Sequence, residues 1–454
     1  MRSIIFFLLV NAALNGVAQD TTRLSLLFVG DIMQHDSQIR AAKLESGGYD
    51  YSECFEFVKP LIEKADVAIG NLELTLAGPP YKGYPQFSAP DELASALKKS
   101  GFDILVTANN HSLDRRKQGL ERTIDVLDSL SIPHTGTFRD SLERARLYPL
   151  VVEKNGFKFS LLNYTYGTNG IPITKPNVIN LIDTTQIKTD LEKAKAQRTD
   201  FIVVFMHWGL EYQDVPSKAQ RSLADLCLKN GAQLVIGSHP HVLQQFEWDQ
   251  DSNTVVAYSL GNFVSGQQSR YRDGGAMLWV EMEKITESDS SSNVVIKDVA
   301  HDLAWVYRNF ETPKKYFILP VKEFESDSII MGKASRDLLK VFAEDARKLL
   351  SSKNKNVIES QRQLIESDYY KIHLGSVPDT PQLDSLSVLR FYNITPSQKH
   401  DSLEWISEPI YDRAVAEAAL QDLKINSPFQ EAKLVWYYWG RKQAALPSHK
   451  DDTN

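Results

Sequence analysis

Six short polar clusters along the chain combine histidine, carboxylate and asparagine side chains, the residue types that bind transition metals. They are Gly30-Asp31-Ile32-Met33-Gln34-His35, Gly70-Asn71-Leu72-Glu73, Asn109-Asn110-His111 with Asp114, His207-Trp208-Gly209-Leu210-Glu211, Ser238-His239-Pro240-His241, and Gly261-Asn262. Such a mixed N/O ligand set suits Mn, Zn or Fe, as one divalent ion or two. Two such ions can generate a hydroxide nucleophile at neutral pH and hold the oxygens of a phosphoryl group.

The clusters share a position in the sequence, because each follows a short apolar run that is typical of a buried β-strand. The expected strands cover residues 24–29, 67–69, 104–107, 157–162, 201–205, 233–236 and 254–258, and helical patterns cover 92–99, 120–130 and 217–229. A single histidine or aspartate at a strand end is more often a turn former or a helix cap. The carboxyl ends of the strands in an open α/β sheet line one crevice, so the repeated placement predicts that the clusters converge.

The overall composition allows a large folded core and limits the partners. The chain has 454 residues, of which 42% are hydrophobic, and its 51 basic and 58 acidic residues give a net charge of −7. Such an acidic chain has no general attraction for nucleic acid, so an anionic ligand needs a local site. The two cysteines, Cys54 and Cys227, are too few for a disulfide framework, and we interpret them as buried thiols.

The N-terminus has the pattern of a secretory signal peptide. Arg2 precedes an apolar run over 4–10, and Gly16-Val17-Ala18 supplies the small residues that a signal peptidase recognises. We therefore expect residues 1–18 to be removed. No other apolar stretch of the sequence approaches the length of a bilayer span. The expectation is an exported protein of the periplasm or cell envelope, with no stable membrane span after cleavage.

The pattern changes toward the C-terminus. Two further strands over 276–282 and 294–299 complete an expected domain at 22–310. The rest, residues 311–454, reads as a helical appendage with helices over 335–365, 414–423 and 430–444 and a Pro/Asp/Ser-rich linker at 378–386. The remaining histidines, at 134, 301, 373, 400 and 449, lie outside the clusters and are interpreted as ordinary.

The ordered motifs resemble one family. Gly-Asp-x-Met-x-His, Gly-Asn-Leu-Glu, Ala-Asn-Asn-His-x-x-Asp, His-Trp-Gly-x-Glu-Tyr, Gly-Ser-His-Pro-His and Ser-Leu-Gly-Asn-Phe follow one another over about residues 24–280. This series resembles the CapA family of bacterial capsule synthesis proteins, which is linked to poly-γ-glutamate. That family is in turn similar to calcineurin-like metallophosphatases. The resemblance implies an α/β fold, a four-layer αββα sandwich with a two-metal site, here followed by the helical C-terminal appendage.

The resemblance also assigns roles to individual positions. It implies that Asp31 bridges both ions and that His111 is the general acid beside them. The other implied ligands are His35, Glu73, Asn110, His207, His239 and His241. His35 stands four residues after Asp31, whereas the phosphatases place this histidine two residues after the aspartate. Residues expected to support the ligands or contact the substrate are Asn71, Asp114, Glu211 and Asn262.

Two functions are consistent with these observations. The first is an exported metal-dependent hydrolase, phosphoesterase-like, in the biosynthesis of a capsule or poly-γ-glutamate type polymer. The alternative is a non-catalytic envelope component that binds an anionic polymer or supports its assembly and export. The expected partners are an anionic polymer or a phosphoester substrate, together with components of a capsule synthase. Metal content and hydrolysis of a simple phosphodiester would distinguish the two functions.

Overall fold

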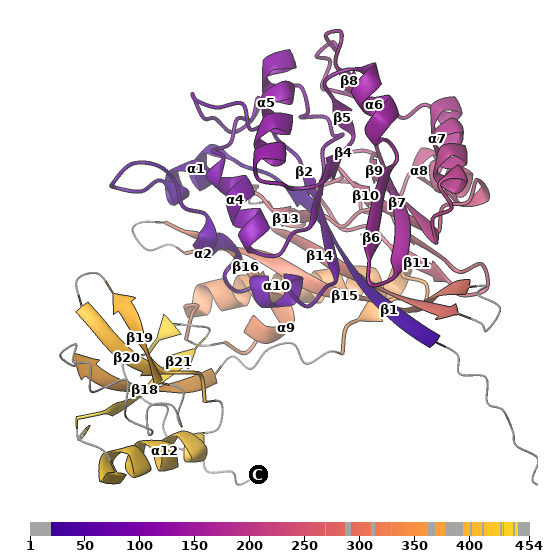
Figure 1. Ribbon diagram of the computed structural model, residues 1–454. Helices are drawn as coiled ribbons and strands as arrows, with labels where there is room; N and C mark the ends of the chain where they lie inside the picture. Colours follow the sequence, from indigo (N-terminus) through magenta and orange to yellow (C-terminus); the bar gives the residue numbers. More distant parts are fainter. Residues whose placement is uncertain are drawn as a thin grey trace, which may run out of the picture. The chain divides into compact units, whose positions relative to one another are not determined.

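The computed structural model describes residues 20–267, 269–286, 292–309, 314–327, 329–361, 368–376, 394–399, 402–410, 413–426, 429, 431–438 and 441–443. The chain divides into two compact units, Met1–Arg362 and Gln363–Asn454 (Figure 1). This division falls later than the expected boundary at 310, because segments that follow this residue, at 316–320, 321–324 and 333–353, still pack against the strand Ser292–Arg308. The expected signal peptide over 1–18, the linker over 378–386, His400 and His449 lie outside the described residues.

A first sheet of the larger unit has a parallel centre and antiparallel outer strands. Its order is β16 (Tyr316–Pro320), β15 (Ser292–Arg308), β14 (Gly274–Thr286), β1 (Asp20–Ile32), β2 (Val67–Leu72), β3 (Ile104–Val106) and β4 (His134–Thr135). The short strands β13 (Asn262–Val264) and β17 (Ile358–Glu359) pair with β1 and β15. Strands β1 to β4 run parallel, and β13 pairs with β1 in parallel as well. Their carboxyl ends therefore lie at one edge of the sheet.

The second sheet has the same kind of centre. Its order is β11 (Phe246–Asp249), β12 (Thr254–Ala257), β10 (Leu234–Ser238), β9 (Phe201–His207), β7 (Phe157–Thr165) and β6 (Leu150–Lys154). The four central strands β12, β10, β9 and β7 are parallel. These strands are buried along most of their length, as expected of continuous Val, Ile, Leu and Phe runs in a covered parallel sheet. A further pair joins β5 (Thr137–Phe138) to β8 (Val178–Ile179).

The two sheets pack against each other, with helices on the outside. Strand β1 packs against β10 and β4 against β7, while α7 (Thr184–Ala196) and α8 (Lys218–Lys229) cover β9 and β10 (Figure 1). The other helices described in the larger unit are α1 (Asp36–Ala42), α2 (Ser52–Phe55), α3 (Lys59–Ile62), α4 (Glu92–Lys99), α5 (Arg116–Ser129), α6 (Ser141–Leu147), α9 (Val321–Phe324) and α10 (Lys333–Lys353). One core cluster joins Leu162, Val204 and Val235 of the second sheet to Leu191 of α7 and Ala224 of α8. The molecule is thus the mixed α/β fold that the sequence predicts.

The smaller unit differs from its sequence-based description. The helix expected over 414–423 is present as α12 (Arg413–Asn426), but the described residues of the stretch 430–444 form no helix. They contain β21 (Lys433–Tyr438) and β22 (Arg441–Lys442), which extend a sheet formed with β18 (Asp368–Ser376), β19 (Ile394–Lys399) and β20 (Ser402–Ser407). The segment Lys-Leu-Val-Trp-Tyr-Tyr is rich in β-branched and aromatic residues, and its pairing with β18 overrides the weak helical pattern. In the larger unit, α10 ends at Lys353, which is earlier than the expected end at 365.

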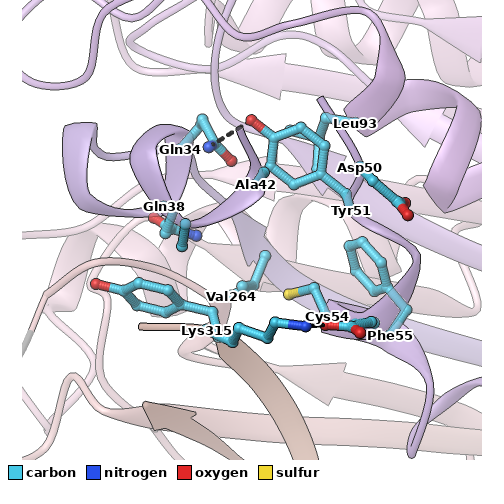
Figure 2. A pocket seen from close by; sticks show the side chains of 13 residues that line it. Gln34, Gln38, Ala42, Asp50, Tyr51, Cys54, Phe55, Leu93, Val264 and Lys315 are labelled. Atoms are coloured by element: carbon cyan, nitrogen blue, oxygen red, sulfur yellow. Dashed lines mark hydrogen bonds and ion pairs between the residues drawn. The ribbon is translucent and has the colours of Figure 1, made fainter. Parts of the chain in front are cut away.

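Both cysteines are free and buried, as the sequence suggests. Cys54 lines a small cavity of about 30 Å³ together with Gln34 and Tyr51 (Figure 2). The Nε2 atom of Gln34 donates a hydrogen bond of 2.9 Å to the Tyr51 hydroxyl, and burial raises the pKa of the Cys54 thiol to about 12. This thiol is therefore protonated at neutral pH and packs as a small apolar group. Of the helices that the structure describes, none has the length and apolar character that crossing a membrane requires.

Gly30 allows the close approach between β1 and residues 260–261 that brings Asp31 into place. A Cβ at this position would lie 2.0 Å from the carbonyl oxygen of Gly261, so the backbone would have to move. Gly30→Ala should therefore lower the free energy of unfolding by about 1–3 kcal/mol. Gly167→Ala is the control, because its Cβ would meet no atom within 4 Å. Urea denaturation of both variants measures the difference, and an unchanged Gly30→Ala protein would be inconsistent with this packing.

Candidate metal centre

Three side chains of the first sheet lie at the same height at its carboxyl edge. Asp31 of β1 is in register with Asn71 of β2 on one side and with Asn262 of β13 on the other. The Nδ2 atom of Asn71 donates to Oδ1 of Asp31 at 2.9 Å. The Asp31 carboxylate is fully buried. Burial raises its pKa, but the hydrogen bond and charge of His241, with His207 and Asn71, outweigh this effect and hold the pKa well below its usual range.

The second sheet supplies a matching row. His207 ends β9 and is in register with Ser238 of β10 and Thr165 of β7. Its Nδ1 atom lies 3.0 Å from the Ser238 hydroxyl and 3.2 Å from Nδ2 of Asn71. The Nε2 atom therefore faces the space between the two sheets. A ring nitrogen fixed by a hydrogen bond orients the opposite nitrogen, as is common for histidines that bind metals.

The segment His239-Pro240-His241 is a strained turn. His239 has a φ of 98° and His241 a φ of 58°, values that non-glycine residues adopt at a cost of about 1–3 kcal/mol. The turn places the His239 backbone N–H 3.3 Å from Oδ2 of Asp31 and Nδ1 of His241 3.0 Å from the same oxygen. One carboxylate thereby holds both the His239 backbone and the His241 imidazole at the site.

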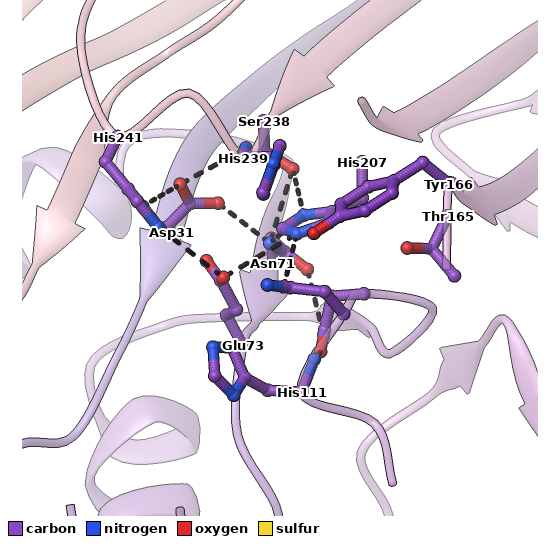
Figure 3. A network of polar contacts seen from close by, with 12 residues as sticks. Asp31, Asn71, Glu73, His111, Thr165, Tyr166, His207, Ser238, His239 and His241 are labelled. Atoms are coloured by element: carbon purple, nitrogen blue, oxygen red, sulfur yellow. Dashed lines mark hydrogen bonds and ion pairs between the residues drawn. The ribbon is translucent and has the colours of Figure 1, made fainter. Parts of the chain in front are cut away.

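Glu73 lies at the centre of these residues. Its side chain is fully buried, and neither carboxylate oxygen has a hydrogen-bond partner among the described residues. Its Oε1 atom is 3.6 Å from Nε2 of His207 and 3.9 Å from Nε2 of His241. Figure 3 shows this carboxylate directed toward Asp31 and the two imidazoles. An unpaired buried carboxylate is costly, and a cation among these ligands would compensate for it.

Two overlapping groups of ligand atoms meet the distance requirement for a metal ion. One consists of Glu73, His239 and His241, and the other of Asp31, Glu73 and His207. In each group the ligand atoms lie within 4.8 Å of one another. The carboxylate common to both groups is Glu73, whereas the resemblance to phosphatases assigns the bridging role to Asp31. Asp31 as the bridge remains a prediction.

The protonation states of this site follow from its burial. Burial, with the nearby positive charge of His239, lowers the pKa of His207 well below its usual range, and burial lowers that of His239 to about 4. Neutral imidazoles are the form that binds metals. Burial, reinforced by the charge of Asp31, raises the pKa of Glu73 far above its usual range. Two ionised carboxylates, Asp31 and Glu73, are therefore unfavourable at this site unless a cation is bound between them.

Asn110, which is expected from the sequence to be a ligand, lies beside His207. Its Oδ1 atom lies 2.8 Å from Nε2 of His207, on the side that faces the two groups. The preceding residue, Asn109, fixes this loop, because its Nδ2 donates to the Leu72 carbonyl at 2.7 Å and its Oδ1 accepts from the His111 N–H at 3.1 Å. The Asn109 side chain was not singled out from the sequence, although it stands within the same cluster.

His111 lies beside the metal ligands and is outside both groups. Its Nδ1 atom is 2.7 Å from Oδ2 of Asp114. Its ring packs edge-on against that of Phe87, with 4.6 Å between the ring centroids. The same Asp114 oxygen accepts the Phe87 backbone N–H at 2.7 Å. Burial raises the pKa of Asp114, and the hydrogen bond from His111 opposes this effect. This pair fixes the ring so that Nε2 is the nitrogen available for proton transfer.

Two other residues that the sequence predicts for the site, His35 and Glu211, do not lie among the grouped ligand atoms. His35 is outside both groups, and its Nδ1 accepts the Gly266 backbone N–H at 3.1 Å. It stands at the N-terminus of α1, since four residues after Asp31 the chain has already left the strand. Glu211 is exposed, and its charge raises the pKa values of Glu73 and Tyr166. Asn262 has the expected supporting contact, with its Oδ1 3.1 Å from Nδ1 of His241.

Tyr166 is a site residue that the sequence reasoning missed. It follows the end of β7, and its ring lies 4.5 Å from that of His239 between ring centroids (Figure 3). Burial, with the charges of Glu211 and Glu73, raises its pKa to about 12. The available signal was its position after the predicted strand at 157–162. A tyrosine is not a typical ligand for these metals, so a search for typical metal ligands in the sequence does not find it.

Comparison with known proteins agrees with the motif series. Residues 25–267 match the model of the bacterial capsule synthesis protein family PGA_cap. The "Capsule biosynthesis protein CapA" of Bacillus anthracis is 31% identical over 263 residues, which are 55% of this chain and 61% of that protein. The "PGA biosynthesis protein CapA" of Bacillus subtilis (strain 168) is 31% identical over 264 residues, 56% of this chain and 67% of that protein. The chain thus spans somewhat under two thirds of the first relative.

Among solved structures, a 5'-nucleotidase from Candida albicans SC5314 is similar over 83% of this chain and 66% of its own, with 12% identity and a TM-score of 0.38. This likeness is weak, and no conclusion about activity rests on it. The family match, by contrast, covers more than half of the chain and includes every residue of the metal centre from Asp31 to Asn262. The protein therefore belongs to the bacterial capsule synthesis protein family PGA_cap.

Proposed function

We propose that this protein is an exported, metal-dependent hydrolase of phosphoesterase type that acts in the synthesis of a capsule or poly-γ-glutamate type polymer. The observation that carries the proposal is the Glu73 carboxylate, which is fully buried and unpaired among the described residues between the imidazoles of His207 and His241. A bound cation would stabilise the ionised form of this carboxylate, because the neighbouring histidines are neutral. The printed names of the two CapA relatives support the polymer context.

The donor set fits a transition metal rather than Ca²⁺ or Mg²⁺. Three imidazoles and two carboxylates are N/O ligands of the kind that Mn, Zn and Fe accept, whereas calcium and magnesium prefer oxygen alone. Glu73, His239 and His241 would hold one ion, and Asp31, Glu73 and His207 a second. When bound, such ions lower the pKa of coordinated water and neutralise charge on a phosphoryl group.

The remaining residues of the site orient the metal ligands or take part in proton transfer to the leaving group. Asp114 holds Nδ1 of His111, which leaves Nε2 of that ring to donate a proton to the oxygen of the leaving group. Asn71 fixes the Asp31 carboxylate and His207 at once. Tyr166 packs against the His239 ring and so limits its motion. The site therefore combines a fixed ligand set with one oriented acid.

Hydrolysis of two simple esters tests the proposal. We expect slow release of p-nitrophenol from p-nitrophenyl phosphate or its bis-ester in the presence of Mn, Zn or Fe, and none with chelator. Asp31→Ala should abolish turnover while circular dichroism stays that of the folded protein, and His134→Ala on β4 is the matched control. Binding of poly-γ-glutamate without ester turnover in any of these metals would instead favour the non-catalytic function.

A further inference from the structure

Arg272 and Tyr212 form a stacked pair that is attached to the metal centre from two sides. The Arg272 guanidinium lies 4.3 Å from the centroid of the Tyr212 ring, which is itself 6.1 Å from that of His241. The Tyr212 N–H donates to the carbonyl of Pro240, between the two histidine ligands, at 2.8 Å. The Arg272 carbonyl accepts from Nδ2 of Asn262 at 2.8 Å. The position of this pair is therefore fixed by the same residues that orient His241.

Among the described residues, no carboxylate lies within ion-pair distance of Arg272. Arg270, in the same loop, is paired with Asp273 at 3.1 Å and with Asp345 at 2.7 Å. Arg272, in contrast, makes no ion pair with any carboxylate in the described part of the chain, and its side chain is half-buried. Stacking on Tyr212 limits its motion, and a planar guanidinium carries several N–H groups along its edge that can donate to an anion. An arginine held in this way is preorganised for a carboxylate or phosphate.

A pocket of about 480 Å³ begins at Tyr212 and gives such a ligand room. Val242 and Leu243, which follow His241 directly, line one side, and Phe342 and Leu349 of α10 line the other. Tyr212 thus lines this partly apolar pocket and also lies beside His241 of the metal centre. Arg272, stacked on the same tyrosine, is a cation close to both.

We propose that Arg272, stacked on Tyr212, binds a second anionic group of the ligand, a carboxylate or a phosphate, next to the group held at the metal centre. The remainder of the ligand would lie in the pocket between Tyr212 and α10. This inference rests on the proposed function in one respect, namely that a ligand group is bound at the metal centre. It assigns the preference for a doubly anionic ligand to a residue beyond the region of the family match, which ends at residue 267.

Equilibrium binding of three phosphonates to the metal-loaded full chain tests this, because none of them is hydrolysed. Phenylphosphonate has one anionic group, whereas 4-carboxyphenylphosphonate and 1,4-phenylenediphosphonate add a carboxylate or a second phosphonate. For the wild type, titration calorimetry should show that the second anion tightens binding by about 10- to 100-fold. Arg272→Gln should remove this gain while the Kd of phenylphosphonate and the metal content stay unchanged. Whichever compound, the carboxylate or the diphosphonate, shows the larger gain in affinity over phenylphosphonate identifies the preferred second anion.

Arg221→Gln is the matched control, because Arg221 is also stacked on a tyrosine, Tyr258, but is paired with Glu247 and lies outside the pocket lining. This variant should keep the full gain. A gain that survives in Arg272→Gln, equal affinities of the wild type for all three compounds, or no binding of any of them would overturn the proposal. Phosphonate binding with the expected gain but no ester hydrolysis would count against the proposed activity alone.

Discussion

Glu73→Gln should yield a folded protein that has lost its transition metal. Glu73 belongs to both groups of ligand atoms, and both of its oxygens lack a hydrogen-bond partner among the described residues. Glutamine keeps the shape of the side chain but removes the charge and one ligand oxygen. Loss of a residue that merely supports a ligand weakens metal binding by about 10- to 100-fold, so loss of this shared ligand should weaken it by more. Elemental analysis after purification without chelator measures the effect.

The free energy of unfolding of Glu73→Gln, measured with and without metal, shows whether the variant loses its metal because a ligand is gone or because the protein unfolds. A neutral glutamine avoids the cost of a buried unpaired carboxylate, so the metal-free variant should be at least as stable as the metal-free wild type. The wild type should gain about 2.7 kcal/mol of stability from metal at one hundred times its Kd, and the variant should gain almost none. His134→Ala, a histidine of β4, should keep the full response. A Glu73→Gln protein with normal metal content would refute the central role of this carboxylate.

The second large effect is expected for His111→Gln. Metal content should remain normal, because His111 lies outside both ligand groups. Turnover of the aryl phosphate should fall by about 10²- to 10⁴-fold, which is the usual contribution of a general acid. The physical reason is that Asp114 fixes Nδ1 of the ring at 2.7 Å, so that Nε2 is the only nitrogen able to give up a proton. Steady-state kinetics with saturating metal measures the loss.

A leaving group that needs no protonation provides the internal comparison. With p-nitrophenyl phosphate the loss in His111→Gln should lie at the low end of that range, and with phenyl phosphate at the high end, since phenolate is the poorer leaving group. His134→Gln should leave both rates unchanged. If His111→Gln lost its metal to the same degree as Glu73→Gln, His111 would be a ligand and the assignment would be wrong.

The sequence predicted the edge of the sheet where the site lies, because apolar strands followed by polar turns are a local pattern. Asp31, His207 and His239 all stand at carboxyl ends of parallel strands, as expected. The shared position of Glu73 could not be predicted in this way. It depends on two sheets that pack across from each other, and no spacing along one strand encodes the distance from Glu73 to His207.

Other differences have equally local causes. His35 matches a motif by type, but its greater spacing places it at the start of α1, where Gly266 occupies its Nδ1. The stretch at 430–444 alternates between apolar and polar residues too weakly to distinguish a helix from a strand, and the partner strand β18 decides the outcome. Arg272 is an unremarkable arginine in the sequence. It becomes a candidate only because Asn262 and Tyr212 fix it beside His241.

The most direct test of the metal centre is anomalous X-ray diffraction from crystals of the full chain, recorded on both sides of the Mn, Fe and Zn absorption edges. The structure predicts at least one anomalous peak within coordination distance of Glu73, shared with His239 and His241 or with Asp31 and His207. Two peaks that both contact Glu73 would match the complete two-ion arrangement. Crystals soaked in each metal that show no peak at Glu73, with the side chains otherwise in place, would contradict the account.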